Sequence, residues 1–203
     1  MPHRRALLAL PCLAVAAQAQ PSFLDNGFLD TGAALALLRA GGLNLYLRHA
    51  VTDRAQLDTG RRGDRAGQRN LSEAGRAQAA ALGAAFRRLG IPVAEVLASE
   101  VFRARDTAEL AFGAARVERD LIADDYTPGS ASEDAAAASR RLAAPVADGN
   151  RVLVGHIVPL GLILGRGLSQ AEFPEGGMGV FRPLGARWAF LGFVAAVQLI
   201  EAS

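Results

Sequence analysis

Cysteine, lysine and histidine are the residue types that this sequence lacks or uses least. The only cysteine, Cys12, lies near the N-terminus, no lysine occurs, and three of the 203 residues are histidine. Beyond residue 19 the chain therefore has no disulfide, no thiolate nucleophile and no cysteine-ligated zinc. Its fold must rest on a hydrophobic core, and an apolar fraction of 51% is sufficient for one ordered domain.

The first 19 residues are predicted to be a secretory signal peptide. Arg4 and Arg5 give a positive start, residues 6–17 are almost wholly apolar, and Ala17-Gln18-Ala19 fits the small-x-small cleavage pattern. The apolar run is too short to span a bilayer, which argues against a membrane anchor. We expect a periplasmic or secreted protein without stable membrane insertion after cleavage, in which residues 20–203 form a single domain.

Loss of this segment brings the net charge close to zero. Arg4 and Arg5 leave with the signal peptide, which contains no acid, so that 20 arginines face 20 acidic residues in the rest of the chain. A balanced chain has little general attraction for polyanions. We therefore expect no nucleic-acid partner.

Hydrophobic periodicity predicts strands that alternate with helices. The expected strands cover residues 43–47, 93–98, 116–117 and 151–154, and the expected helices cover residues 31–39, 73–89, 101–112, 132–144 and 160–164. Residues 178–200 are predicted to be strands interrupted at residues 183–185. This alternation favours an α/β fold, a three-layer α/β/α sandwich with a mostly parallel central sheet.

The two histidines that remain after cleavage both follow predicted strands. His49 comes after Arg48 at the end of the first apolar run, and His156 comes after the run at 152–154. Between them in the sequence, Arg103 opens a predicted helix. Because ligands bind beyond the carboxyl ends of parallel strands, these four side chains are expected to form a compact site for a phosphate dianion.

Four segments resemble the histidine phosphatase superfamily, also called the phosphoglycerate mutase-like family. Leu-Arg-His-Ala at residues 47–50 resembles its arginine–histidine signature, with alanine where many members carry glycine. Residues 68–79 resemble its helix after the first loop, and residues 98–108 its second arginine segment. Val-Leu-Val-Gly-His at residues 152–156 resembles its second histidine segment. The resemblance is greatest to the small exported bacterial branch.

The resemblance implies a role for each of the four site residues. His49 would be the nucleophile that forms a phosphohistidine, which water then hydrolyses. Arg48 and Arg103 would bind the non-bridging phosphate oxygens, and a protonated His156 would add a further donor. Neither a cofactor nor a metal is implied, and no cluster of carboxylates and histidines suited to a metal is evident in the sequence.

The sequence leaves the proton donor for the leaving group open. Asp124 and Asp125 are the candidates, because the family usually supplies this acid from a segment after the second arginine. A solvated acidic turn is the alternative interpretation of both. Three other acids stay open for this role: Asp120, Glu172 and Glu175. Thr52, close behind His49, is predicted to line the substrate pocket.

Two departures from the family pattern bear on activity. Glu100 lies near Arg103 in the sequence, where it would either pair with that arginine and weaken phosphate binding or face outward, the option that we favour. Ile157 follows His156 where some branches carry an aspartate that serves as the acid. The acid is therefore expected in the loop around Asp124 and Asp125.

These inferences predict an exported, metal-independent phosphatase that hydrolyses small phosphate monoesters through a phosphohistidine on His49. The alternative is a weak or inactive family member that binds a phosphorylated envelope component or a protein. The physiological substrate and the oligomeric state stay open.

Overall fold

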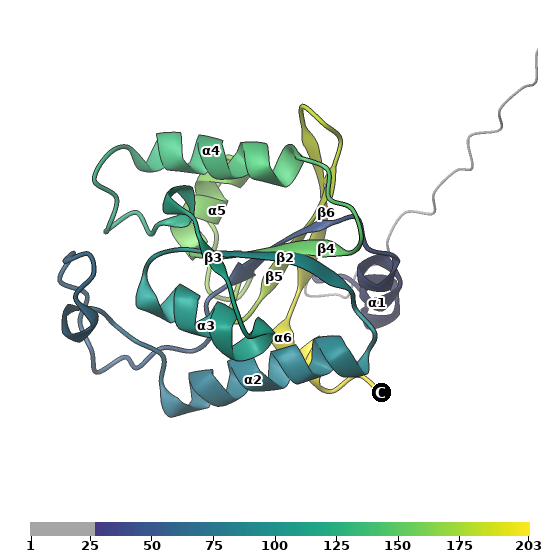
Figure 1. Ribbon diagram of the computed structural model, residues 1–203, viewed down its shortest axis with the longest axis horizontal. Coiled ribbons are helices and arrows are strands. Elements are labelled where there is room, and N and C mark those ends of the chain that lie inside the picture. Colours follow the sequence, from purple (N-terminus) through teal and green to yellow (C-terminus); the bar gives the residue numbers. More distant parts are fainter. Residues whose placement is uncertain (1–26) are drawn as a thin grey trace, which may run out of the picture.

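The computed structural model describes residues 27–203, which form a mixed six-stranded sheet in the order β3-β2-β4-β1-β5-β6 (Figure 1). Strands β1, β2, β3 and β4 pair in parallel, whereas β5 pairs with β1 and β6 in antiparallel orientation. The predicted α/β class with a mostly parallel sheet is confirmed, and the predicted signal peptide lies outside the described residues. The strands are β1 (Asn44–Arg48), β2 (Val93–Ala98), β3 (Arg116–Val117), β4 (Asn150–Gly155), β5 (Met178–Pro183) and β6 (Trp188–Val194).

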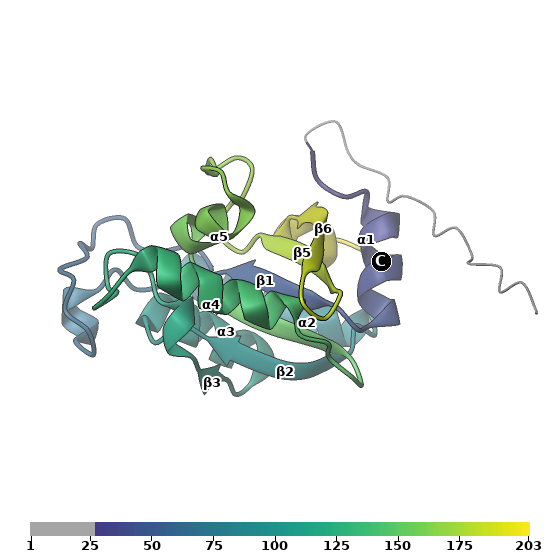
Figure 2. The same cartoon turned by 90° about the horizontal axis from the view of Figure 1, so that it is seen from above.

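Helices cover both faces of the sheet. Figures 1 and 2 show α4 and α5 on one face and α2, α3 and α6 on the other, with α1 at one end of the sheet. The helices are α1 (Thr31–Ala40), α2 (Glu73–Arg88), α3 (Phe102–Phe112), α4 (Ala131–Ala143), α5 (Ile157–Leu164) and α6 (Ala196–Ile200), with short 3₁₀ turns at Arg65–Gly67 and Arg119–Leu121. The three layers that the alternation of elements predicted are therefore present.

Successive residues of the central strands supply the two halves of the core. Leu45 and Leu47 of β1 pack into the cluster that includes α1, α2 and α3, whereas Tyr46 between them packs against α4 and α5. Side chains in a strand alternate between faces, so a strand covered on both sides must be apolar throughout. All five residues of β1 are buried, which places the end of this strand, and the residue after it, inside the molecule.

The C-terminal segment differs from the prediction of strands through residue 200. β6 ends at Val194, and residues Ala196–Ile200 form helix α6. The side chain of Gln198 accepts a hydrogen bond from the backbone N–H of Ala195 at 2.8 Å, and Leu199 is fully buried in the core. Five residues are too few to display a helical repeat, so their apolar content alone does not distinguish a short helix from a strand.

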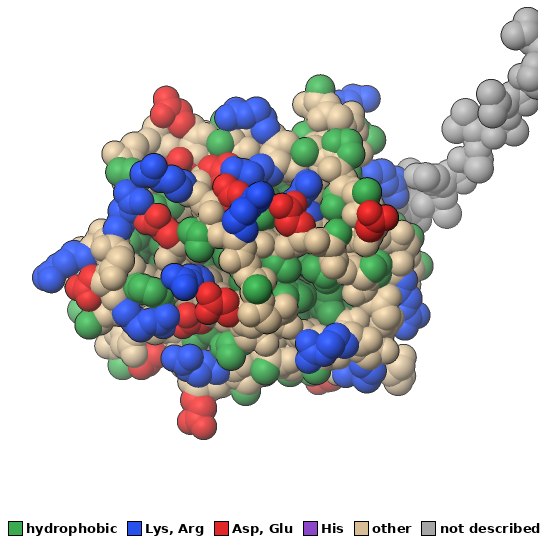
Figure 3. Space-filling model, in the orientation of Figure 1, with side chains coloured by type: hydrophobic (Ala, Val, Ile, Leu, Met, Phe, Trp, Pro, Cys, Tyr) green, Lys and Arg blue, Asp and Glu red, His purple; other side chains and the backbone are tan. Residues whose placement is uncertain are grey.

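Charged side chains are interspersed over the surface. On the face seen in Figure 3, acidic and basic side chains lie next to one another, and no broad patch of one sign is formed. No helix within residues 27–203 has the length and apolar character needed to cross a membrane.

Candidate active site

The two histidines meet because they follow neighbouring parallel strands. Arg48, the last residue of β1, lies opposite Gly155, the last residue of β4, and the backbone N–H of His49 donates to the Gly155 carbonyl at 3.1 Å. The imidazole rings of His49 and His156 are 5.4 Å apart between centroids. Both histidines are almost fully buried, with 3% of each exposed. The strand-end position predicted for both residues is therefore present.

Tyr46 fixes the backbone of His156 through two hydrogen bonds. Its hydroxyl accepts a hydrogen bond from the backbone N–H of His156 and donates to the His156 carbonyl, both at 3.1 Å. A Cβ atom on Gly155 would lie 2.3 Å from this hydroxyl oxygen, so that only glycine fits directly before His156. The glycine of the second histidine segment thus has a packing function.

The third strand end brings Arg103 and Ser99 to the same place. Arg103 lies in the first turn of α3, which follows β2, and it is 4% exposed. The hydroxyl of Ser99, just after β2, is 3.0 Å from Nε2 of His156. Thr107 of α3 accepts a hydrogen bond from the backbone N–H of Ala50 at 2.9 Å, which ties this helix to the segment after His49. The arginine of α3 and both histidines therefore share one rigid corner of the fold.

His49 is held as a neutral imidazole with one nitrogen assigned to the protein. Its Nδ1 lies 2.9 Å from the Ala50 carbonyl, which can only accept, so Nδ1 carries the proton and Nε2 keeps a lone pair. Burial, followed by the positive charge of Arg103, lowers the pKa of His49 to about 3; the hydrogen bond to the Ala50 carbonyl opposes this effect, and Arg48 adds a smaller lowering. Nε2 is therefore unprotonated at neutral pH, as a nucleophile requires.

His156 differs from the prediction of a protonated donor. Burial and the nearby charges of Arg103 and Arg48 lower its pKa well below the usual value, so the free site holds a neutral ring. Its Nδ1 is buried and has no hydrogen-bond partner, while Nε2 contacts Ser99. A neutral His156 still offers a donor at Nδ1 when the Ser99 hydroxyl donates to Nε2. The sequence could not predict this state because it depends on tertiary burial.

Arg48 and Arg103 each keep the same edge of the guanidinium group free of hydrogen bonds to the protein. Nη1 of Arg48 donates to the Phe173 carbonyl at 2.5 Å, and Nη1 of Arg103 donates to Asp58 at 2.9 Å. In both residues Nε is buried without a partner. Burial, partly opposed by Glu175, lowers the pKa of Arg48 to about 10, at which the group stays cationic at neutral pH. Each guanidinium thus has one nitrogen fixed to the protein and keeps its Nε–Nη2 edge, the edge suited to a bidentate contact with phosphate.

The acid candidates lie in different surroundings. Asp124 and Asp125 are both exposed in the loop after the second 3₁₀ turn. Partial burial of its carboxyl group raises the pKa of Asp125, and the charge of Arg103 opposes this effect. Thr52 is buried, and its hydroxyl donates to Glu175 at 2.7 Å.

Glu100 does not contact the phosphate-binding arginines. Its two carboxylate oxygens accept from Nε and Nη2 of Arg62 at 2.5 and 2.9 Å. The outward orientation favoured from the sequence is therefore present. The carboxylate that does contact Arg103 is Asp58, at 2.9 Å.

Four residues near the site were not among those predicted from the sequence, although two of them, Arg69 and Ser99, lie in segments that resemble the family. Ser99, Asp58, Arg69 and Tyr126 belong to loops or to a strand end, and three of them meet around the Asp58 carboxylate. The length of the polar loop at residues 51–70 indicated a function for that region but not which of its residues carry it. Figure 1 shows this loop projecting at one end of the molecule.

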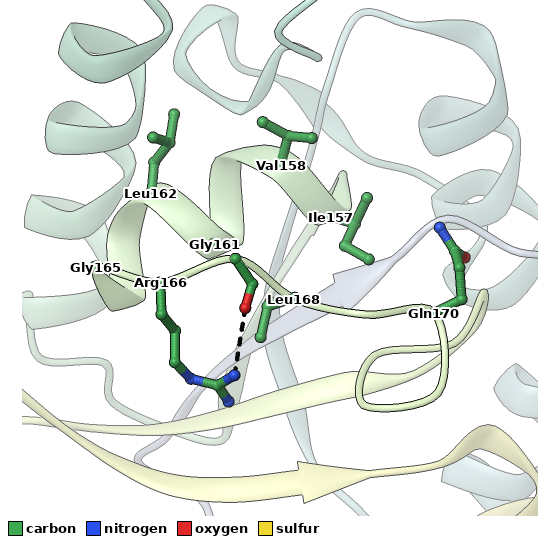
Figure 4. A pocket seen from close by; sticks show the side chains of 9 residues that line it. Ile157, Val158, Gly161, Leu162, Gly165, Arg166, Leu168 and Gln170 are labelled. Carbon is green, nitrogen blue, oxygen red and sulfur yellow. Dashed lines mark hydrogen bonds between the residues drawn. The ribbon is translucent and has the colours of Figure 1, made fainter.

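A cavity is formed by the segment that follows His156. It has a volume of about 650 Å³ and is lined by α5 and the segment that follows it. Figure 4 shows Ile157, Val158 and Leu162 along the helix, with Leu168 and Gln170 beyond. Ile157 directly follows His156, so the cavity begins next to the site. Within residues 27–203 no group of three or more histidine, cysteine or acidic side chains is placed to hold a metal ion.

Residues 45–125 match the family model of the histidine phosphatase superfamily (branch 1). The matched stretch includes Arg48, His49, Arg103 and Asp125, whereas His156 lies beyond it and joins the site through the pairing of β1 with β4. No curated protein sequence matches the chain.

Solved structures of three phosphatases share the fold. The protein histidine phosphatase SixA complexed with tungstate has a TM-score of 0.55 at 14% identity, over 77% of this chain and 99% of that chain. A mutant phosphoserine phosphatase from Entamoeba histolytica with phosphoserine has a TM-score of 0.55 at 12% identity, over 77% of this chain and 98% of the other. A mycobacterial glucosyl-3-phosphoglycerate phosphatase with VO3 has a TM-score of 0.51 at 20% identity, over 73% and 96%.

The fold and the positions of the two histidines at strand ends agree with this partial family match. Residues 45–125 are similar to the histidine phosphatase superfamily (branch 1), and the fold is shared with solved phosphatases.

Proposed function

We propose that this protein is an exported, metal-independent phosphatase that hydrolyses phosphate monoesters through a phosphohistidine on His49. One observation carries the proposal: a neutral, buried His49 lies beside His156 and within the electrostatic influence of two guanidiniums whose Nε–H groups are buried without partners. Buried donors without acceptors are costly, and a phosphate group would satisfy several at once.

The first chemical step follows from the nitrogen that is free. Nε2 of His49 attacks phosphorus in line, the new P–N bond forms, and the P–O bond to the alcohol breaks. Arg48 and Arg103 bind the non-bridging oxygens, and Nδ1 of His156 donates to one of them. These fixed donors stabilise the charge that the transferring group spreads over its oxygens. The alcohol leaves with a proton from the general acid.

The second step returns the enzyme to its starting state. Water attacks phosphorus, the P–N bond breaks, and the lone pair returns to Nε2 of His49. The carboxylate formed in the first step accepts the proton of the attacking water. Inorganic phosphate and the reprotonated acid are the products of this step.

Asp125 is the better proposed donor of the two aspartates. Its raised pKa favours the protonated form that an acid needs, and the charge of Arg103 acts on it. Asp124 lies next to it in the same exposed turn and serves as a matched comparison. Thr52 is proposed to line the substrate pocket, with its hydroxyl oriented by Glu175.

The proposed substrates are small phosphate monoesters outside the cytoplasm. The structural relatives act, by their names, on phosphohistidine in protein, on phosphoserine and on glucosyl-3-phosphoglycerate. This range supports a common phosphoryl site with variable surroundings. We propose the periplasm or the external medium as the location because of the signal peptide predicted at residues 1–19.

Hydrolysis of p-nitrophenyl phosphate tests the proposal. His49→Ala is expected to stay folded, by circular dichroism, and to lose at least about 1000-fold in kcat, because the nucleophile is gone. Activity of the unmodified protein is expected to survive excess chelator. The exposed Arg61→Ala variant is the control and should keep its activity, since that side chain is 74% exposed. Full activity in His49→Ala, or abolition by chelator, would contradict the proposal.

A further inference from the structure

The carboxylate of Asp58 accepts hydrogen bonds from three segments of the chain. Its Oδ1 accepts hydrogen bonds from Nη1 of Arg103 at 2.9 Å, from the hydroxyl of Tyr126 at 2.6 Å and from the backbone N–H of Arg69 at 2.9 Å. The Asp58 side chain is 16% exposed. Although Asp58 lies in the 51–70 loop, its carboxylate is thus fixed by donors from three different segments.

The Asp58–Arg103 contact is a single hydrogen bond and leaves the phosphate edge free. Glu100 shows the other geometry, because it occupies both Nε and Nη2 of Arg62. Asp58 contacts Arg103 only through Nη1, and Nε of Arg103 stays buried without a partner. A carboxylate that competed with phosphate would take the bidentate edge. Asp58 instead fixes the guanidinium by its opposite nitrogen.

Arg69 is a third guanidinium at the same carboxylate. Its Nε is 3.9 Å from Oδ2 of Asp58 and, like Nε of Arg103, is buried without a hydrogen bond. The positive charge of Arg69 contributes to the lowered pKa of both His49 and His156, after the larger effects of burial and Arg103. The Arg69 guanidinium thus shares the Asp58 carboxylate with Arg103 and adds to the positive charge that acts on the histidine pair.

We propose that Asp58 is a positioning residue that holds the guanidiniums of Arg103 and Arg69 with their free N–H groups towards the substrate phosphate. The hydroxyl of Tyr126 and the Arg69 backbone N–H fix Asp58 itself. Arg69 becomes a further phosphate-binding residue in this account. The inference rests on the proposed phosphatase function, since it refines the same phosphate site.

The direction in which phosphate affinity changes when Asp58 is replaced distinguishes a positioning role from that of a simple counter-charge. Removing a negative charge near the site would by itself strengthen the binding of an anion. Loss of the contact that orients Arg103 would weaken it, because an unrestrained side chain must be ordered when phosphate binds. A positioning role thus predicts weaker binding in Asp58→Asn, although the variant is less negative.

Calorimetric titration of the purified protein with inorganic phosphate and with orthovanadate measures this effect. Asp58→Asn is expected to raise both dissociation constants about ten-fold, on the scale of one charge-assisted hydrogen bond. Tyr126→Phe keeps the ring and is expected to raise them by a smaller factor in the same direction. Asp64→Asn changes an acid of the same loop that caps a 3₁₀ turn, and it should leave them unchanged. Unchanged or tighter binding in Asp58→Asn overturns the proposal.

A spectroscopic measurement distinguishes positioning from a general loss of structure. The Nε–H signal of Arg103, identified by its absence in Arg103→Lys, is expected to shift and to exchange faster with water in Asp58→Asn. The same signal should be unaltered in Asp64→Asn. An unaltered signal in Asp58→Asn overturns the proposal, even if phosphate binding changes.

These measurements do not require turnover, so the two proposals fail separately. Phosphate binding that depends on Asp58 without hydrolysis of any ester would contradict the proposed function alone. Rapid hydrolysis with normal phosphate binding in Asp58→Asn would contradict the positioning role alone.

Discussion

At the scale of single residues, the arginines of the site act on the histidines before any substrate binds. Burial and the charges of Arg103 and Arg48 lower the pKa of His49 to about 3. The same groups lower the pKa of His156. The cations that would neutralise phosphate therefore also keep the proposed nucleophile unprotonated. One arrangement of charge serves both requirements of the reaction.

The lowered pKa of His49 has a measurable effect on stability. An unfolded histidine takes up a proton below its usual pKa of about 6.5, whereas folded His49 does not until about pH 3. The free energy of unfolding therefore decreases as the pH falls through this window. Between pH 7 and pH 5 the contribution is a loss of about 2 kcal/mol in the free energy of unfolding.

Urea unfolding at pH 7 and pH 5 checks this value, with His49→Gln as the comparison. The variant lacks the titrating group and is expected to lose about 2 kcal/mol less than the unmodified protein over this interval. All other ionisable groups contribute equally to both proteins. An identical loss in the two proteins would show that His49 titrates normally.

The residues that the sequence predicted for the site share one property. His49, His156, Arg48 and Arg103 lie at or directly after the ends of strands, or in the first turn of the next helix, and the sheet brings such positions together. Asp58 and Arg69 lie within a long loop, where no period relates sequence to side-chain direction. The protonation state of His156 depends on burial, which only the packed structure defines.

At the scale of secondary-structure elements, α2 and α3 position Arg103 by packing closely. A Cβ atom on Gly83 of α2 would lie 1.9 Å from the Ala111 carbonyl of α3. A Cβ atom on Gly75 would lie 1.8 Å from the Val51 carbonyl, in the segment after His49. Backbone atoms cannot move aside as a flexible side chain can. Gly83 therefore sets the distance between α2 and α3, and Gly75 sets the distance between α2 and the segment after His49.

Replacement of Gly83 by alanine tests this packing. Alanine favours the helix, but the clash with the α3 backbone is expected to dominate and to lower the free energy of unfolding by about 2 kcal/mol. Gly129→Ala is the control, because no atom lies within 4 Å of its added Cβ. Chemical denaturation of both variants gives the comparison. A Gly83→Ala variant as stable as the control would mean that α2 and α3 separate at little cost.

Most element positions were predictable from the sequence, and the exception has a physical cause. Strands β2 and β3 have the predicted bounds, and α2 differs from its prediction by one residue. These segments show a clear period or end at Gly90 and Pro92, which cannot continue the helix. Residues Ala196–Ile200 were predicted as strand because so short a segment shows no period, and only contact with the core decides its conformation.

At the scale of the whole molecule, the sheet separates the two halves of the hydrophobic core, and the candidate site lies at the carboxyl ends of its parallel strands. The leucines of β1 face α1, α2 and α3, whereas Tyr46 faces α4 and α5 and also supports the backbone of His156. The site thus rests on both halves of the core. This mixed sheet with its covered faces confirms the predicted fold class, and residues 45–125 match the family model of the histidine phosphatase superfamily (branch 1).

The predicted export depends on residues 1–19, so it is tested on the full-length chain. The positive start and apolar run of residues 1–19 predict cleavage after Ala19. After expression of the full chain in a bacterium, the protein is expected outside the cytoplasm with Gln20 at its N-terminus, as mass spectrometry would show. An uncleaved chain confined to the cytoplasm would contradict the proposed location and leave the chemistry of the site unaffected.

Trapping of a covalent intermediate is the most direct test of the central claim. The protein is mixed with a phosphate ester labelled in the phosphoryl group and quenched within milliseconds in alkaline denaturant, in which phosphohistidine survives. The account predicts label on the unmodified protein, located at His49 by peptide mapping and absent from His49→Ala. Turnover without any label on the protein, or label on His49→Ala at an unaltered level, would contradict the account.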